Sequence, residues 1–186
     1  MIEIVPYRAA WPDEYRKVAA DLRKALGDTV LALHHIGSTA VPGLVAKDII
    51  DIQLTVADLG VSRAARLEPL GLVLARPICD HCPAGLDLPS VELGKQMFKA
   101  MGRAVNLHIR QSGRFNQRYP VLVRDYLRAD PAAAKAYGEI KQQLARRFPD
   151  GEDPYYDIKD PVSDVLFSAA SLWAEQQGWV MPLSDN

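Results

Sequence analysis

The sequence predicts an α+β domain in which a mixed β-sheet is flanked by helices and followed by a C-terminal helical segment. Strand-like and helix-like periods alternate over residues 1–112, the expected α/β core, whereas residues 113–186 show helical periods only. The chain has 186 residues, 48% of them hydrophobic, which is enough for one core. We therefore expect a single domain over residues 1–186.

The first half of the chain supplies the elements of this core. Pro12 suits the first turn of a helix that ends near Leu26, and the apolar positions between them recur every three to four residues. Residues 49–56 are almost wholly apolar, which is typical of a strand covered on both faces. Asp58 is expected to cap a helix that ends near residue 70. Strands are expected at residues 30–36, 49–56, 72–75, 91–100 and 104–111, and a loop at 76–90.

The second half predicts three helices, at residues 115–129, 131–148 and 153–177. Pro131 opens the second of them, and Pro161 is expected to kink the third. Charge is unevenly placed, since residues 95–147 hold 12 basic and 3 acidic side chains and residues 148–186 hold 8 acidic and 1 basic. Two interpretations stay open: the basic block attracts phosphates, or oppositely charged helical faces pack together.

The bulk composition excludes several classes of protein. The formal net charge is −1, so no global field favours a membrane surface or nucleic acid. No apolar run approaches the roughly 18 residues of a membrane span, and the N-terminus does not resemble a signal peptide. Two cysteines give no disulfide framework. We expect a cytoplasmic protein that does not bind membranes.

A candidate binding site lies where the expected strand at 30–36 ends. Gly37, Ser38 and Thr39 follow this strand, and glycine lets another group approach the backbone closely. If a helical turn begins here, its free N–H groups and hydroxyls would bind an anion. Asp51, on the next strand, would then face a phosphate through a bridging divalent cation. The alternative is a helix cap beside an unrelated strand acid.

The stretch HIGSTAVPGLVAKDIIDIQ, residues 35–53, resembles the GrpB family. The resemblance continues through NLHI at 106–109 and VRDYLRADPAAAKAYGEIKQQLARRFP at 123–149, and ends in YYDIK at 155–159. The family is similar in fold to nucleotidyltransferases, whose signature is a Gly-Gly or Gly-Ser turn followed by acid–apolar–acid. Some of its members are fused to dephospho-CoA kinase.

The resemblance implies roles for individual residues. Gly37 and Ser38 match the phosphate-binding turn, and Asp51 matches the first metal-binding carboxylate. Gln53 stands where those enzymes have their second acid, and an amide is a weaker ligand for Mg²⁺. His108 falls where many of them have a third carboxylate, and it is the candidate for a catalytic role beside Asp51. Asp48 is expected to point to the opposite face from Asp51.

Further ligand-binding residues are expected around this motif. His35 and His108 are the titratable candidates, and basic side chains could reach phosphate oxygens. The basic candidates are Lys95, Arg124, Lys141 and Lys159. Cys79 and Cys82 form a C-x-x-C pair for which a metal site, a redox pair and a plain loop stay open, the loop being favoured.

Two functions of different kinds follow. The first is an enzyme that transfers a nucleotidyl or phosphoryl group with Mg²⁺, with Asp51 holding the metal. The second is a non-catalytic nucleotide-binding or accessory domain that assists a partner protein such as dephospho-CoA kinase, and Gln53 favours it. An RNA-modifying role is a third, weaker hypothesis, because the chain lacks a basic and aromatic face. Both main hypotheses expect a nucleotide or another phosphate-bearing small molecule as ligand.

Overall fold

The computed structural model describes residues 1–76, 78–100, 102–150 and 152–185, without the side chains of residues 152 and 153. Five strands form one mixed sheet with the order β1-β2-β5-β4-β3. The strands are β1 (Ala32–Ile36), β2 (Ile50–Val56), β3 (Leu72–Ala75), β4 (Lys95–Ala100) and β5 (Val105–Gln111). β2 and β5 are parallel, and the other neighbours are antiparallel. The α+β class with a mixed sheet is thus confirmed.

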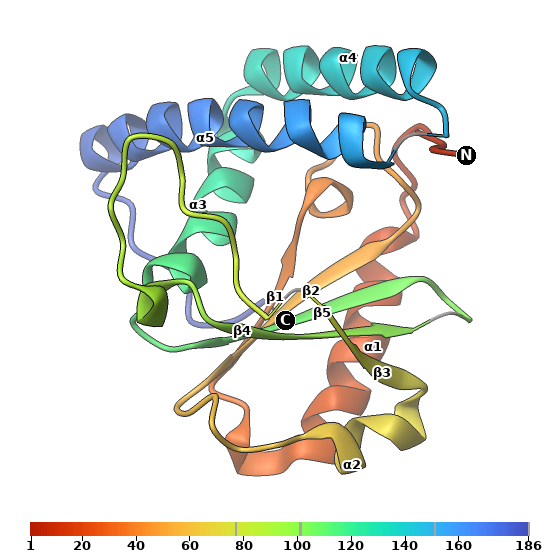
Figure 1. Cartoon of the computed structure of the whole chain (residues 1–186), viewed down its shortest axis with the longest axis vertical. Helices are drawn as coiled ribbons and strands as arrows, with labels where there is room; N and C mark the ends of the chain where they lie inside the picture. Colours follow the sequence, from red (N-terminus) through yellow and green to blue (C-terminus); the bar gives the residue numbers. More distant parts are fainter. Residues whose placement is uncertain (77, 101, 151, 186) are drawn as a thin grey trace.

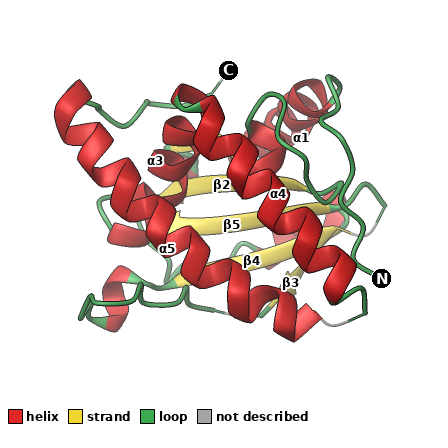
Figure 2. Cartoon of the chain, turned by 90° about the horizontal axis from the view of Figure 1, so that it is seen from above, coloured by secondary structure: helices red, strands yellow, loops and turns green. Residues whose placement is uncertain are grey.

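The helices form layers on the two faces of this sheet. The helices are α1 (Trp11–Leu26), α2 (Ala64–Leu67), α3 (Phe115–Ala129), α4 (Pro131–Arg147) and α5 (Glu152–Gln177). Figure 1 shows α1 and α2 below the sheet and α4 and α5 above it. Figure 2 shows α4 and α5 lying across the strands. No helix in the described parts of the chain combines the length and apolar character needed to cross a membrane.

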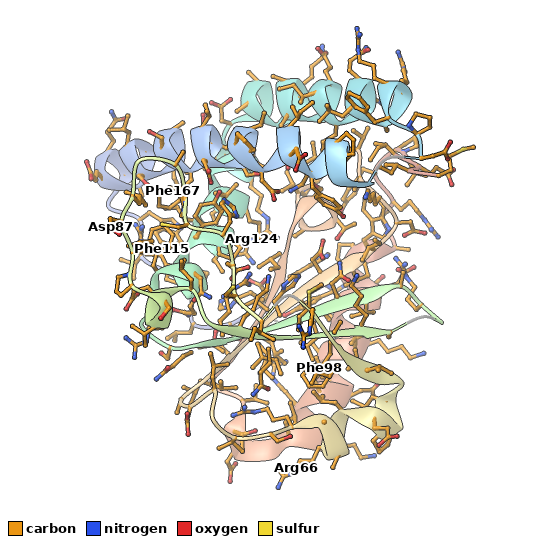
Figure 3. All side chains as sticks on the ribbon, viewed as in Figure 1. Arg66, Asp87, Phe98, Phe115, Arg124 and Phe167 are labelled. Atoms are coloured by element: carbon orange, nitrogen blue, oxygen red, sulfur yellow. The ribbon has the colours of Figure 1, made fainter. Side chains whose placement is uncertain are left out.

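The main core lies between α1 and the sheet. Alternate residues of β2 and β5 point toward α1 and are buried with its apolar side. Figure 3 shows Phe98 on the same lower face of the sheet. The core members from these three elements are Trp11, Tyr15, Ala19, Leu22, Leu26, Ile50, Ile52, Leu54, Val56, Val105, Leu107 and Ile109. The remaining residues of β2 and β5 therefore face α3, α4 and α5, and many of them are polar.

Two predicted elements differ from the structure. The helix expected from Asp58 is wrong over its first half, because only Ala64–Leu67 is α-helical. The Asp58 carboxylate accepts a hydrogen bond from the Gly60 N–H at 2.7 Å, a local turn that competes with a helix. The strand expected at 91–100 begins only at Lys95, because a 3-10 turn occupies Ser90–Glu92.

The chain beyond α5 returns to the sheet. The Asp185 N–H donates to the Leu33 carbonyl at 2.8 Å, and the Ser184 hydroxyl donates to the same carbonyl at 2.9 Å. β1 is an edge strand, so this segment covers backbone groups that another strand could otherwise pair with.

Candidate functional site

The polar face of the sheet brings the central candidates together. In the parallel β2–β5 ladder Asp51 lies beside Asn106, and Gln53 lies beside His108. All four are on the face opposite α1, because their neighbours Ile50, Ile52 and Leu107 are in the core below.

Gly37 and Asp51 are in direct contact. Gly37 has φ +70°, and a Cβ atom there would lie 2.5 Å from Asp51 Oδ2. Only glycine fits this position, because it combines a left-handed backbone with a carboxylate packed against its Cα. A 3-10 turn, Ser38–Ala40, follows. The glycine after β1 thus makes room for the acid on β2.

Asp51 and His108 form a polar pair on this face. Asn106 Nδ2 donates to Asp51 Oδ1 at 2.9 Å, and His108 Nε2 lies 3.7 Å from the same oxygen. Burial works to raise the pKa of Asp51, but His108, Asn106 and the charge of Lys159 lower it below its usual value. Burial lowers the pKa of His108 in spite of Asp51. At neutral pH an ionised carboxylate therefore faces a neutral imidazole.

Lys141 reaches the site from α4. Its Nζ donates to Ser38 Oγ at 2.8 Å and to the Val45 carbonyl at 2.5 Å. It also lies 4.7 Å from the centroid of the Tyr137 ring. The helix can come this close to the loop because residue 138 is a glycine. A Cβ atom at this position would lie only 3.2 Å from Val45 Cγ2.

Lys141 is an unusual cation because it is buried without a matching acid. The residue is 2% exposed, and none of the described carboxylates lies within ion-pair distance of its Nζ. Burial, with a smaller effect from Lys159, lowers the pKa of Lys141 to about 7, while Asp51 opposes the shift. Such a group favours an anionic ligand that would restore its charge.

Lys159 approaches the same place from α5. Its side chain is 27% exposed, and its Nζ lies 3.5 Å from Asp160 Oδ1 and 5.9 Å from the centroid of the Tyr156 ring. Its charge acts on both Asp51 and Lys141. Ser38, Asp51, His108, Lys141 and Lys159 therefore form one group, which we call the Asp51 site.

Two predicted cations lie elsewhere, in buried ion pairs. Arg124 on α3, labelled in Figure 3, donates to Asp185 Oδ2 at 2.5 Å and to the His35 carbonyl at 2.9 Å. Lys95 on β4 donates to Asp80 Oδ1 at 2.6 Å. Their charges are already matched by carboxylates, so these contacts give them structural roles.

Gln53 and the strand residue His35 are also held by neighbours. Gln53 is fully buried, and its Oε1 accepts a hydrogen bond from Arg110 at 2.9 Å. His35 faces α1, where its ring stacks on Tyr15 at 4.9 Å. Burial lowers the pKa of His35 to about 4. His35 and Thr39 hydrogen-bond to each other at 3.0 Å, and the charge of Asp51 raises the pKa of His35 against the larger effect of burial.

Sequence reasoning missed two residues of consequence. Lys47 Nζ lies 4.6 Å and 4.7 Å from the centroids of Tyr155 and Tyr156, and donates to the Tyr156 hydroxyl at 3.2 Å. Asp80, in the C-x-x-C loop, binds Lys95, Arg110 and Asn116. Asp80 could have been noticed in the sequence as an acid between Cys79 and Cys82, whereas no sequence signal marked Lys47.

The donor set does not fit a resident two-metal centre. Asp51 is the one carboxylate of the site, the Gln53 oxygen is bonded to Arg110, and Asn106 donates its amide to Asp51. Over the described ranges no three His, Cys, Asp or Glu side chains are grouped to hold a metal. Cys79 and Cys82 are exposed free thiols. Magnesium brought by a nucleotide would find one carboxylate, Asp51.

A groove of about 630 Å³ lies outside this site. It runs between the turn at residues 42–45 and α4, and includes Leu127, Ala134 and Gly138. Its lining is mainly apolar and includes neither Asp51 nor Lys141. The groove and the Asp51 site therefore share no side chain, although Val45 lines the groove and its carbonyl accepts a hydrogen bond from Lys141.

The fold and the site define a class of α+β proteins in which a Gly-Ser turn and a single acid lie on the polar face of a mixed sheet. The chain belongs to the GrpB family, whose model, described as "GrpB protein", matches residues 1–168. The crystal structure of the conserved protein GrpB from Enterococcus faecalis superposes with a TM-score of 0.74 at 29% identity, covering 92% of this chain and 99% of that one.

Relatives of known sequence agree with this membership. A UPF0157 protein of Streptomyces coelicolor is 33% identical over 173 residues, 91% of this chain and 83% of that protein. A protein of Mycolicibacterium paratuberculosis named dephospho-CoA kinase is 30% identical over 197 residues, 96% of this chain and 48% of that protein. The chain therefore spans about half the length of the dephospho-CoA kinase relatives that it matches.

Proposed function

We propose that the chain binds a nucleotide or another phosphate-bearing small molecule at the Asp51 site. The observation that carries this proposal is Lys141, a buried cation bonded to Ser38 Oγ with no described acid to match its charge. A buried charge without a partner is costly, and a bound phosphate would offset that cost.

The surrounding residues support a ligand of this kind. Gly37 is exposed and Ser38 is partly exposed, so a ligand can reach the turn from solvent. Lys159 adds a second cation, and the Ser38 hydroxyl can donate to a phosphate oxygen while Lys141 bonds to it. In this proposal Asp51 orients His108 and contacts any magnesium that the nucleotide carries.

Nucleotidyl or phosphoryl transfer is the second candidate function. It is favoured by the neutral His108 imidazole beside the ionised Asp51, with Nδ1 buried and without a partner among the described atoms. Such an imidazole can take a proton from an attacking hydroxyl. The single carboxylate argues against the usual two-metal route.

An accessory role is the alternative to catalysis. The relatives named dephospho-CoA kinase are about twice as long as the matched region, so in them a segment like this chain accompanies a further one. We propose as this alternative that the chain binds a nucleotide for a partner enzyme and does not transform it.

Calorimetric titration of a nucleotide panel tests the proposal. We expect AMP, ADP or ATP to bind the wild type, and Lys141→Met to weaken binding at least about tenfold, the loss of one charged hydrogen bond. Lys135→Met is the matched control, because Lys135 is an exposed lysine of the same helix. Binding that Lys141→Met leaves unchanged would place the ligand elsewhere. Phosphorus NMR of the same mixtures with Mg²⁺ separates turnover from binding alone.

A further inference from the structure

A second cavity, of about 120 Å³, lies under the loop at residues 78–90. Arg110 of β5 and the rings of Phe115 and Tyr119 at the start of α3 form its walls, and Figure 3 labels Phe115 there. By volume the cavity would hold about four water molecules. His81 also lines it and its side chain is 43% exposed, so a small molecule can enter from this side.

Asn116 presents a buried acceptor in this cavity. The residue is 3% exposed, and its Nδ2 donates to Asp80 Oδ2 at 3.0 Å and to the Gly94 carbonyl at 2.9 Å. Both partners are acceptors, which fixes the orientation of the amide. Its Oδ1 then has no partner among the described atoms. A buried oxygen without a donor is costly, so the cavity favours a ligand that donates a hydrogen bond.

The backbone of α3 adds a second acceptor, and β5 adds a donor. Pro120 lies inside the helix and has no N–H, so the carbonyl of Asn116, four residues earlier, lacks its usual helical donor. Arg110 makes two described hydrogen bonds to Asp80 and one to Gln53. A guanidinium has five N–H groups, so two of them are left for a ligand.

The charges around the cavity are balanced. Lys95 and Arg110 both bond to Asp80, whereas Asp164 accepts from the Tyr119 hydroxyl at 3.1 Å and lies 2.8 Å from His81 Nε2. With His81 uncharged, two carboxylates match two cations. A neutral ligand therefore suits this cavity better than an ion does, because an ion would leave a buried charge unmatched.

We infer that this cavity binds the primary carboxamide group of a small neutral molecule. The two N–H groups of the carboxamide donate to Oδ1 and to the backbone carbonyl of Asn116. Its carbonyl accepts from Arg110, and its flat face lies against the rings of Phe115 and Tyr119. The inference goes beyond the proposed function and is independent of it, because the cavity and the Asp51 site share no residue.

The test is NMR titration with propionamide, butanone and propionate, which have the same size. Butanone lacks the N–H donors, and propionate replaces them with a negative charge. We expect the Leu93 methyl and Asn116 side-chain signals to report propionamide binding at least about tenfold tighter than that of either analogue. Pro120→Ala gives the Asn116 carbonyl an N–H donor and should weaken propionamide at least about threefold relative to butanone. Pro161→Ala, inside α5 and outside the cavity, is the matched control and should leave this ratio unchanged.

Several outcomes would overturn the inference. Equal affinity for the three compounds, or no binding of any, would mean that water alone fills the cavity. Tightest binding of propionate would indicate an anion site at Arg110 instead. Propionamide that shifts signals of Lys141 and not those of Leu93 would bind elsewhere. If Pro120→Ala fails to fold, the three compounds still decide the question on the wild type. Phosphate binding at Lys141 is measured separately with nucleotides, so the proposed function stands or fails independently.

Discussion

Ligand binding at Lys141 should be accompanied by proton uptake. In the free protein burial lowers the pKa of Lys141 from 10.5 to about 7, so near neutral pH only about half of the molecules carry the charge. A phosphate beside Nζ favours the ammonium form and raises the pKa again. Protons are therefore taken up on binding, and the affinity falls as pH rises above about 7.

The size of the effect follows from that value. At pH 8 about a tenth of the free protein holds a protonated Lys141, so binding a ligand that restores the ordinary pKa takes up about 0.9 proton. Between pH 7.5 and 9 the affinity should fall by nearly tenfold per pH unit, about 1.4 kcal/mol. The ligand adds little to this slope, because its phosphate is already ionised above pH 8.

Calorimetry in buffers of different ionisation enthalpy measures the proton uptake directly. ADP is titrated at pH 8 in EDTA, and the number of protons is the slope of the observed enthalpy against the buffer enthalpy. Lys141→Met is the comparison and should show uptake near zero with residual binding. Uptake below about 0.2 proton in the wild type would mean that the ligand leaves the charge of Lys141 unchanged, which contradicts a phosphate beside its Nζ.

Three further predictions concern the scaffold of the site. Gly37→Ala should cost about 1–3 kcal/mol of stability in urea and abolish ligand binding, because its Cβ meets Asp51. Gly43→Ala is the control, since Gly43 also has a positive φ but faces open space, and it should keep binding. Equal losses of binding in the two variants would contradict this prediction. Asp80→Asn should lower the free energy of unfolding by about 3–5 kcal/mol, because the buried cations Lys95 and Arg110 lose their carboxylate. A loss under about 1 kcal/mol would contradict this prediction. Deleting the chain from residue 182 onward should expose the edge of β1 and cause the protein to self-associate, which sedimentation velocity would detect. A deletion variant that stays monomeric would show that this edge needs no cover.

The strand–turn–strand motif was readable from sequence because its information is local. Gly37 at the end of an apolar run and Asp51 inside the next already specify a close backbone approach. The alternation of β5 likewise gave the two faces of the sheet, and the three C-terminal helices were confirmed within one residue at nearly every end. Local sequence therefore predicted this motif and the C-terminal helices, whereas the helix expected from Asp58, also a local prediction, was wrong.

The role of each cation was not readable, because it depends on partners far away in the chain. Lys95, Arg124 and Lys141 look equivalent in sequence. Lys95 is neutralised by Asp80, which lies in a loop, and Arg124 is neutralised by Asp185, which lies beyond the last helix. Of these three cations, only Lys141 has no described acid within ion-pair distance. Tertiary structure alone distributes these acids, so the sequence could name the candidate lysines without ranking them.

The most direct test of a phosphate site at Lys141 is a crystal structure of the protein soaked with the nucleotide that binds best in solution. We expect a phosphate oxygen within about 3 Å of Lys141 Nζ and of Ser38 Oγ, on the polar face of the sheet beside Asp51. A nucleotide bound instead in the groove between residues 42–45 and α4, with Lys141 still bonded only to Ser38 and Val45, would contradict a phosphate site at Lys141.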